Sequence, residues 1–91
     1  MTVVARRVKI CNVRGLHARA AAKFVEMAQG FDATIHVSRD GETVSADSIM
    51  ELLMLAASKG SEIGIETSGP DAESAADSLA GLVEAGFHED E

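Results

Sequence analysis

The chain has very little of several residue types. Among 91 residues there is one cysteine, one proline, and no tryptophan or tyrosine. A single cysteine, Cys11, excludes an internal disulfide and any Cys-x-x-Cys metal or redox motif, and it fits a reducing compartment. No apolar run approaches the ~20 residues that span a bilayer, and the first residues lack the order of a signal peptide. We therefore expect a cytoplasmic protein with no membrane association.

Positive charge is scarce and unevenly distributed. The net charge is −7, which argues against nucleic acid as a partner. Most of the basic residues nevertheless lie in the first quarter of the chain, and no acidic residue precedes Glu26. These basic residues are Arg6, Arg7, Lys9, Arg14, Arg19 and Lys23. They would attract an anionic ligand or an acidic partner surface, but charges that are merely scattered over the surface fit the pattern equally well.

The hydrophobic pattern predicts one α+β domain over residues 1–91. Alternating apolar residues predict strands over 3–11, 33–38 and 42–45, and a fourth around Ile63 and Ile65. Helical periodicity predicts helices over 18–29 and 48–58, and a third that opens at 69–71. Asp40-Gly41 is typical of a two-residue hairpin. The order β-α-β-β-α-β-α favours an antiparallel or mixed sheet with helices on one face, and residues 88–91 are expected to be frayed.

The predicted helix over 48–58 has almost no polar face. Its apolar residues are Ile49, Met50, Leu52, Leu53, Met54, Leu55, Ala56 and Ala57. A helix that is apolar on every side should be buried on every side, but a small domain with one sheet can hardly surround it. We expect part of this surface to be exposed and to bind partners, with burial under loops as the alternative.

The segment most informative about function is Gly-Leu-His-Ala-Arg at residues 15–19. Glycine can adopt a positive φ, and His17 then stands where a helix begins. The first amides of a helix have no partner within it, and together with the helix dipole they form an anion site. Arg19 adds a planar cation suited to phosphate oxygens. A ring nucleophile beside an anion site suggests a histidine that carries a phosphoryl group. The simpler alternative is a histidine that only caps the helix.

The other two histidines are weaker candidates. His36 lies on the polar side of a predicted strand and His88 in the acidic tail, so both are most simply surface residues. No metal-ligand cluster, phosphate-binding Walker loop or acid–base pair accompanies His17. We therefore expect no metal and no cofactor, and a protein that acts as a co-substrate in phosphoryl transfer rather than as a stand-alone enzyme.

Ser48 begins a capping-box pattern. In Ser-Ile-Met-Glu at residues 48–51, the serine and the glutamate can each accept a hydrogen bond from the other residue's backbone amide. Capping of the helix is the role that these residues favour by themselves.

Taken together, these motifs resemble those of the HPr family, the histidine-containing phosphocarriers of the bacterial phosphoenolpyruvate-dependent phosphotransferase system. Residues 15–19 are similar to the family's active-site motif, and residues 48–50 are similar to its regulatory serine motif at the family's spacing. The hairpin at 40–41 and the turn over 59–63 also agree. The resemblance covers essentially the whole chain. It implies an open-faced β-sandwich, in which a four-stranded antiparallel sheet carries three helices on one side.

The resemblance also implies the role of each site residue. His17 would accept a phosphoryl group on Nδ1 from Enzyme I and pass it to an Enzyme II A-type acceptor, while Arg19 steadies the group. The expected phosphate-binding residues are Gly15, Ala18, Arg19 and Ala20. Ile49, Met50 and Leu53 would dock both partners. Ser48 matches a serine that a dedicated kinase/phosphatase modifies in many relatives, which implies further regulatory targets.

Two departures from the family pattern leave the acceptor open. Ala20 stands where the family usually has proline, as in the branch linked to nitrogen and stress regulation, and Glu51 stands where many relatives have glycine. The acceptor and any transported sugar therefore stay undefined. One alternative function is a purely regulatory binding module that works through its apolar helix. The other is a small acylphosphatase-like hydrolase, which would need Asn12, the only asparagine, to place a water molecule.

Overall fold

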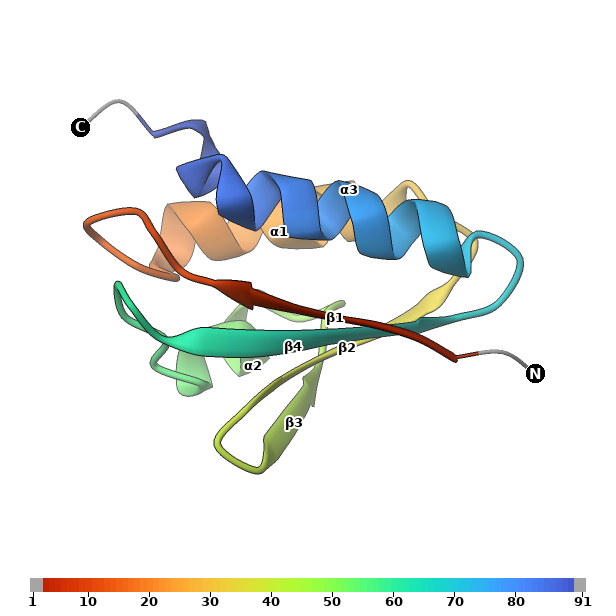
Figure 1. The fold of residues 1–91 in the computed structure, drawn as a ribbon, viewed down its shortest axis with the longest axis horizontal. Helices are drawn as coiled ribbons and strands as arrows, with labels where there is room; N and C mark the ends of the chain where they lie inside the picture. Colours follow the sequence, from red (N-terminus) through yellow and green to blue (C-terminus); the bar gives the residue numbers. More distant parts are fainter. Residues whose placement is uncertain (1–2, 90–91) are drawn as a thin grey trace.

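Four antiparallel strands form one sheet in the spatial order β1-β4-β2-β3. The strands are β1 (Val3–Lys9), β2 (Thr34–Arg39), β3 (Glu42–Ser45) and β4 (Glu62–Ser68). The helices are α1 (Ala18–Gln29), α2 (Ile49–Met54) and α3 (Ala72–Glu84), followed by a short 3-10 helix, η1 (Gly86–His88). The structure is a computed structural model that describes residues 3–89 (Figure 1). The last two residues of the expected frayed tail, 90 and 91, lie outside this range.

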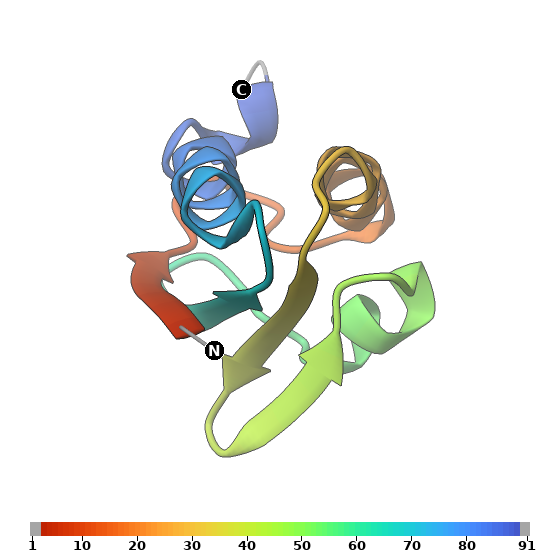
Figure 2. The same cartoon turned by 90° about the vertical axis from the view of Figure 1, so that its right-hand side faces the viewer.

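The helices form the second layer of an α+β fold. α1 and α3 lie side by side over one face of the sheet (Figure 2), and α2 packs against α1 and β3. The prediction of a four-stranded antiparallel sheet with three helices is confirmed. The strand order, which the sequence left open, places β1 and β4 next to each other although they are far apart in the chain.

The core lies between the sheet and the helices, as the alternation of the strands predicts. Inward side chains of the sheet meet wholly buried side chains of α1 and α3, such as Phe24 and Leu79. The buried residues of the sheet include Val8, Ile35, Val37, Ile63 and Ile65. Residues between them along the strands, including Arg7, His36 and Glu66, are exposed on the open face. Burial of these apolar side chains is the main force that holds the layers together.

α2 is shorter than the apolar pattern predicts, since it ends at Met54 instead of continuing to residue 58. Ala56 has φ 52, a left-handed conformation that a right-handed helix cannot contain. The chain therefore leaves the helix at Leu55, and Ala57 turns into the core. β1 also ends early, at Lys9, although Ile10 continues the hydrogen bonding through the backbone of the 60–61 turn.

The prediction of a frayed C-terminal segment is wrong for residues 88 and 89. Gly86, Phe87 and His88 have φ values of 64, 57 and 57, and they turn the chain back after α3. Phe87 is fully buried, and Lys23 Nζ donates a hydrogen bond of 2.6 Å to its carbonyl oxygen. The buried Phe87 ring and the hydrogen-bonded Phe87 carbonyl thus hold a segment that its acidic composition had led us to expect in solvent. Within residues 3–89, no helix is both long enough and apolar enough to cross a membrane.

The start of α1 can be tested with proline. Ala20 lies in the first turn, where a helix amide has no intrahelical partner, so we expect Ala20→Pro to keep the fold with a small change in Tm. Ala21→Pro is the matched control, because Ala21 is equally buried but its amide donates to the His17 carbonyl (2.8 Å). That variant should lose about 3 kcal/mol of stability in thermal unfolding. Equal losses in both variants would place the helix start elsewhere.

Candidate functional site

A contact between two backbone segments fixes the loop that joins β1 to α1. Gly15 has φ +67, and a Cβ there would lie 2.6 Å from the Ala57 carbonyl oxygen and 2.8 Å from Ser58 Cα. Only glycine fits both the conformation and the space. The next amide, that of Leu16, donates to the same Ala57 carbonyl (2.8 Å). The chain therefore enters α1 from a position set by the segment that follows α2.

Asn12 stabilises the same loop through two hydrogen bonds to the backbone of Gly15. Its carbonyl oxygen accepts a hydrogen bond from the Gly15 amide (3.1 Å), and its Nδ2 donates to the Gly15 carbonyl (2.8 Å). This geometry distinguishes the four expected phosphate-binding residues from one another. The Gly15 amide is already used inside the loop, and Ala20 is fully buried. Of that expected set, Ala18 and Arg19 are the residues exposed to solvent.

His17 is the N-cap of α1. Its backbone is extended, and its Nδ1 accepts a hydrogen bond from the Arg19 amide (3.3 Å). The side chain is 21% exposed. Capping is thus confirmed, and it is compatible with chemistry, because the Nδ1 lone pair faces the helix N-terminus, where the dipole and the free amides favour an anion.

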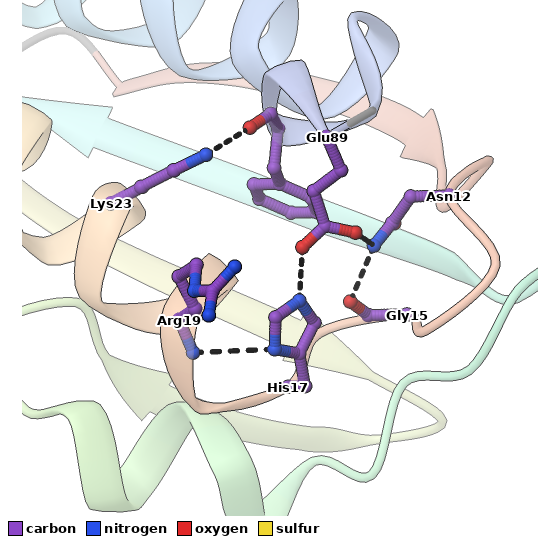
Figure 3. A network of polar contacts seen from close by, with 7 residues as sticks. Asn12, Gly15, His17, Arg19, Lys23 and Glu89 are labelled. Carbon is purple, nitrogen blue, oxygen red and sulfur yellow. Dashed lines mark hydrogen bonds and ion pairs between the residues drawn. The ribbon is translucent and has the colours of Figure 1, made fainter. Parts of the chain in front are cut away.

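Glu89 faces the other nitrogen of the His17 ring. Its Oε2 is paired with His17 Nε2, and its Oε1 accepts from Asn12 Nδ2 (2.8 Å) (Figure 3). The Glu89 side chain is only 10% exposed. The hydrogen bonds from Asn12 and from His17 hold the pKa of Glu89 below its ordinary value, so the group is a carboxylate at neutral pH. Because Nε2 faces an acceptor and Nδ1 faces a donor, the hydrogen bonds assign the ring proton to Nε2.

Half of the early basic residues are used by the fold. Arg6 pairs with Asp77 (2.9 Å), Arg7 pairs with Glu62 (2.6 Å), and Lys23 holds the Phe87 carbonyl. Within the part of the chain that the structure describes, the Arg19 guanidinium has no hydrogen-bond or ion-pair partner, while the amide of the same residue donates to His17 Nδ1 (Figure 3). Structural pairing accounts for Arg6 and Arg7. Within residues 3–89, Lys9 and Arg14 have no side-chain partner either, so Arg19 differs from them by its contact with His17, which makes it the main candidate for an anionic ligand.

α2 presents an exposed apolar surface, as expected. Ile49, Met50 and Met54 are 39%, 70% and 72% exposed. Leu53 is half-buried against the core, and Leu52 is fully buried. We call Ile49, Met50, Leu53 and Met54 the α2 patch. Only Met54 was absent from the expected docking residues. Met54 is the last residue of α2, and this position could not be recognised while the helix was predicted to continue to residue 58.

Ser48 caps α2. Its Oγ accepts a hydrogen bond from the Glu51 amide (3.3 Å), which confirms the serine half of the predicted capping box. The two remaining histidines are exposed, His36 on β2 and His88 in η1. No cluster of three or more His, Cys, Asp or Glu side chains within residues 3–89 could hold a metal ion.

Comparison with known proteins decides the family. The family model described as the PTS HPr component phosphorylation site matches residues 4–85. The chain belongs to the HPr family. Its relatives include phosphocarrier protein HPr of Cupriavidus necator, 45% identical over 94% of this chain and 97% of the relative. Phosphocarrier protein NPr of Shewanella violacea is 44% identical over 98% of both chains, and NPr of Escherichia coli is 42% identical over 96% and 98%.

Solved HPr structures have the same fold. HPr from Bacillus anthracis superposes with a TM-score of 0.87 at 46% identity, covering 91% of this chain and 99% of that chain. HPr-C-His from Thermoanaerobacter tengcongensis gives a TM-score of 0.88 at 38% identity over the whole of both chains. The protein is therefore a phosphocarrier of the phosphotransferase system, and neither the hydrolase nor the purely regulatory alternative is favoured. Relatives named NPr fit the likeness to the nitrogen-related branch.

The loop contact makes a sharp prediction about Gly15. We expect Gly15→Ala to destabilise the protein well beyond the conformational cost of about 1–2 kcal/mol for a left-handed residue, because the new Cβ meets backbone on two sides. Gly41→Ala is the control, since Gly41 has φ +85 but nothing within 4 Å of the added Cβ. Urea unfolding measures both losses, and amide NMR shifts of residues 15–20 report displacement of the loop. Equal losses would contradict the close packing.

Proposed function

We propose that His17 is the residue that carries the phosphoryl group. In this proposal a cytoplasmic Enzyme I supplies the group, and an Enzyme II A-type protein accepts it. The single observation that carries the proposal is that His17 Nδ1 points its lone pair at the N-terminal amides of α1 while the side chain stays partly exposed. The Nδ1 lone pair attacks phosphorus in line. As the N–P bond forms, the bond from phosphorus to the donor breaks, and its electron pair stays with the donor.

The residues around Nδ1 suit the product of this step. Once Nδ1 is bonded to phosphorus it no longer accepts from the Arg19 amide, so that amide becomes a donor for a phosphoryl oxygen. The amide of Ala18, an exposed residue in the first turn of α1, and the guanidinium of the exposed Arg19 are further candidate donors. Charge-assisted hydrogen bonds of this kind are stronger than neutral ones. In the second transfer the acceptor attacks phosphorus, and the electron pair of the N–P bond returns to Nδ1.

Phosphorylation with purified Enzyme I and phosphoenolpyruvate tests the assignment. Wild type should take up one phosphoryl group that is acid-labile and base-stable, and His17→Ala should take up none. His36→Ala is the control, since His36 is exposed on β2 and is not part of the site; it should react at the wild-type rate. Labelling of His17→Ala at the normal rate would overturn the proposal.

The α2 patch is the docking surface that we propose for both partners. Its support is the exposure of three large apolar side chains on one short helix, which costs free energy unless a partner covers them. α2 also packs against α1, which begins directly after His17, and the Leu16 amide just before His17 donates to the Ala57 carbonyl in the segment after α2.

A charge in the α2 patch should therefore impair transfer without unfolding the protein. Met50→Glu is the suitable change, because Met50 is highly exposed whereas Leu53 contributes to the core. We expect at least a tenfold slower transfer, about 1.4 kcal/mol, with Tm nearly unchanged. Val3→Glu, at a residue 60% exposed on β1, is the control and should transfer normally. Loss of folding in Met50→Glu would show that the patch is core.

Ser48 is proposed as a regulatory phosphorylation site beside this patch, served by a dedicated kinase/phosphatase. A phosphoserine at a helix start suits the dipole, but it would add negative charge next to the exposed Glu51 and the docking surface. Ser48→Asp should keep the cap and slow phosphorylation of His17 by Enzyme I. Ser48→Asn caps equally well without charge and should react like wild type. If the two variants react alike, charge at Ser48 has no regulatory effect.

A further inference from the structure

The chain after α3 folds back onto the site in a conformation that most residues avoid. Phe87 and His88 both have φ 57 and follow Gly86 at φ 64. A non-glycine residue with positive φ is uncommon, and two in succession are held only where the surroundings demand it. We call residues 86–89 the C-terminal strap.

Four contacts hold the strap against the rest of the site. The Phe87 ring is fully buried, and the Phe87 carbonyl accepts a hydrogen bond from Lys23 of α1 (2.6 Å). Two residues later, Glu89 reaches both the loop at Asn12 and the ring of His17 (Figure 3). The turned backbone thus delivers one carboxylate to one ring nitrogen, from a part of the chain 72 residues away in sequence.

We propose that Glu89 is a positioning residue for phosphoryl transfer at His17. Its carboxylate keeps the ring proton on Nε2 and thereby keeps the lone pair on Nδ1, where the phosphoryl group is received. This inference rests on the proposed role of His17. Asn12 Nδ2 occupies Glu89 Oε1, which leaves Oε2 to face the ring.

The chemical need for such a residue follows from the imidazole ring. A neutral imidazole exists as two tautomers, and the one with its proton on Nδ1 has no lone pair there to attack phosphorus. A carboxylate at Nε2 favours the productive tautomer before the reaction. When the N–P bond forms at Nδ1, positive charge develops on the ring, and the same carboxylate offsets it. The proton stays on Nε2 throughout, so the step requires no proton transfer to or from the ring.

Glu89→Gln tests this role with little change in size. Glutamine brings an NH₂ group into a space where Asn12 and His17 both present donors, so it cannot replace the carboxylate at both. Glu84→Gln is the matched control: it removes the same charge from an exposed residue at the end of α3. Two quantities are measured for each protein at neutral pH. One is the ¹⁵N shifts of the His17 ring, which report the tautomer, and the other is the rate of phosphorylation by Enzyme I.

We expect wild type and Glu84→Gln to hold the proton on Nε2. Glu89→Gln should show a mixture of tautomers and phosphorylation about tenfold slower. An unchanged tautomer in Glu89→Gln overturns the inference even if the rate falls, because the strap would then act only as structure. An unchanged rate overturns it as well. Failure of the underlying proposal looks different, since wild type would then carry no phosphoryl group on His17.

Discussion

The geometry of the site depends on the close contact of the Gly15 backbone with the backbone at Ala57 and Ser58. No side chain larger than hydrogen fits at residue 15, and the positive φ there turns the chain toward α1. The Leu16 amide adds a hydrogen bond to Ala57 in the same contact. The loop therefore has one position relative to the segment after α2, and His17 has one place from which to begin the helix. The contact also links the loop of His17 to the helix that carries the α2 patch.

From that position both nitrogens of the His17 ring are engaged, and each by a different kind of group. Nδ1 meets an amide donor of α1, and Nε2 meets the carboxylate of Glu89. A capping histidine and a nucleophilic histidine need the same thing, namely an unprotonated Nδ1 at a helix N-terminus. Helix capping by His17 and phosphoryl transfer at His17 therefore require the same arrangement of residues 15–19. The amide that stabilises the resting helix becomes available to an anion when Nδ1 is bonded to phosphorus.

Much of this could be predicted from residues alone, and some could not. The bounds of α1 and the inward faces of the strands follow from local periodicity, because helix and strand periods place apolar side chains regularly on one side. The length of α2 did not follow, since Ala56 is a good helix former that nevertheless takes a left-handed conformation, just before Ala57 is buried in the core. Of the site, His17, Arg19 and Ser48 carried local signals. Asn12 drew notice only as part of an alternative function.

The order of the elements, the buried face of each strand and the start of α1 at a histidine could all be predicted from the sequence. Those features depend on neighbours in the chain, so a local pattern can carry them. The strand order, the partners of the basic residues and the exposure of α2 depend on contacts between distant segments, so they became known only from the folded structure. It alone brought Glu89 to His17. An acidic residue near the end of an acidic tail has no local mark of function. The buried Phe87 and the left-handed turn at residues 86–88 bring Glu89 to His17, although the two residues are far apart in the sequence. Contacts of this kind depend on the packing of the whole chain.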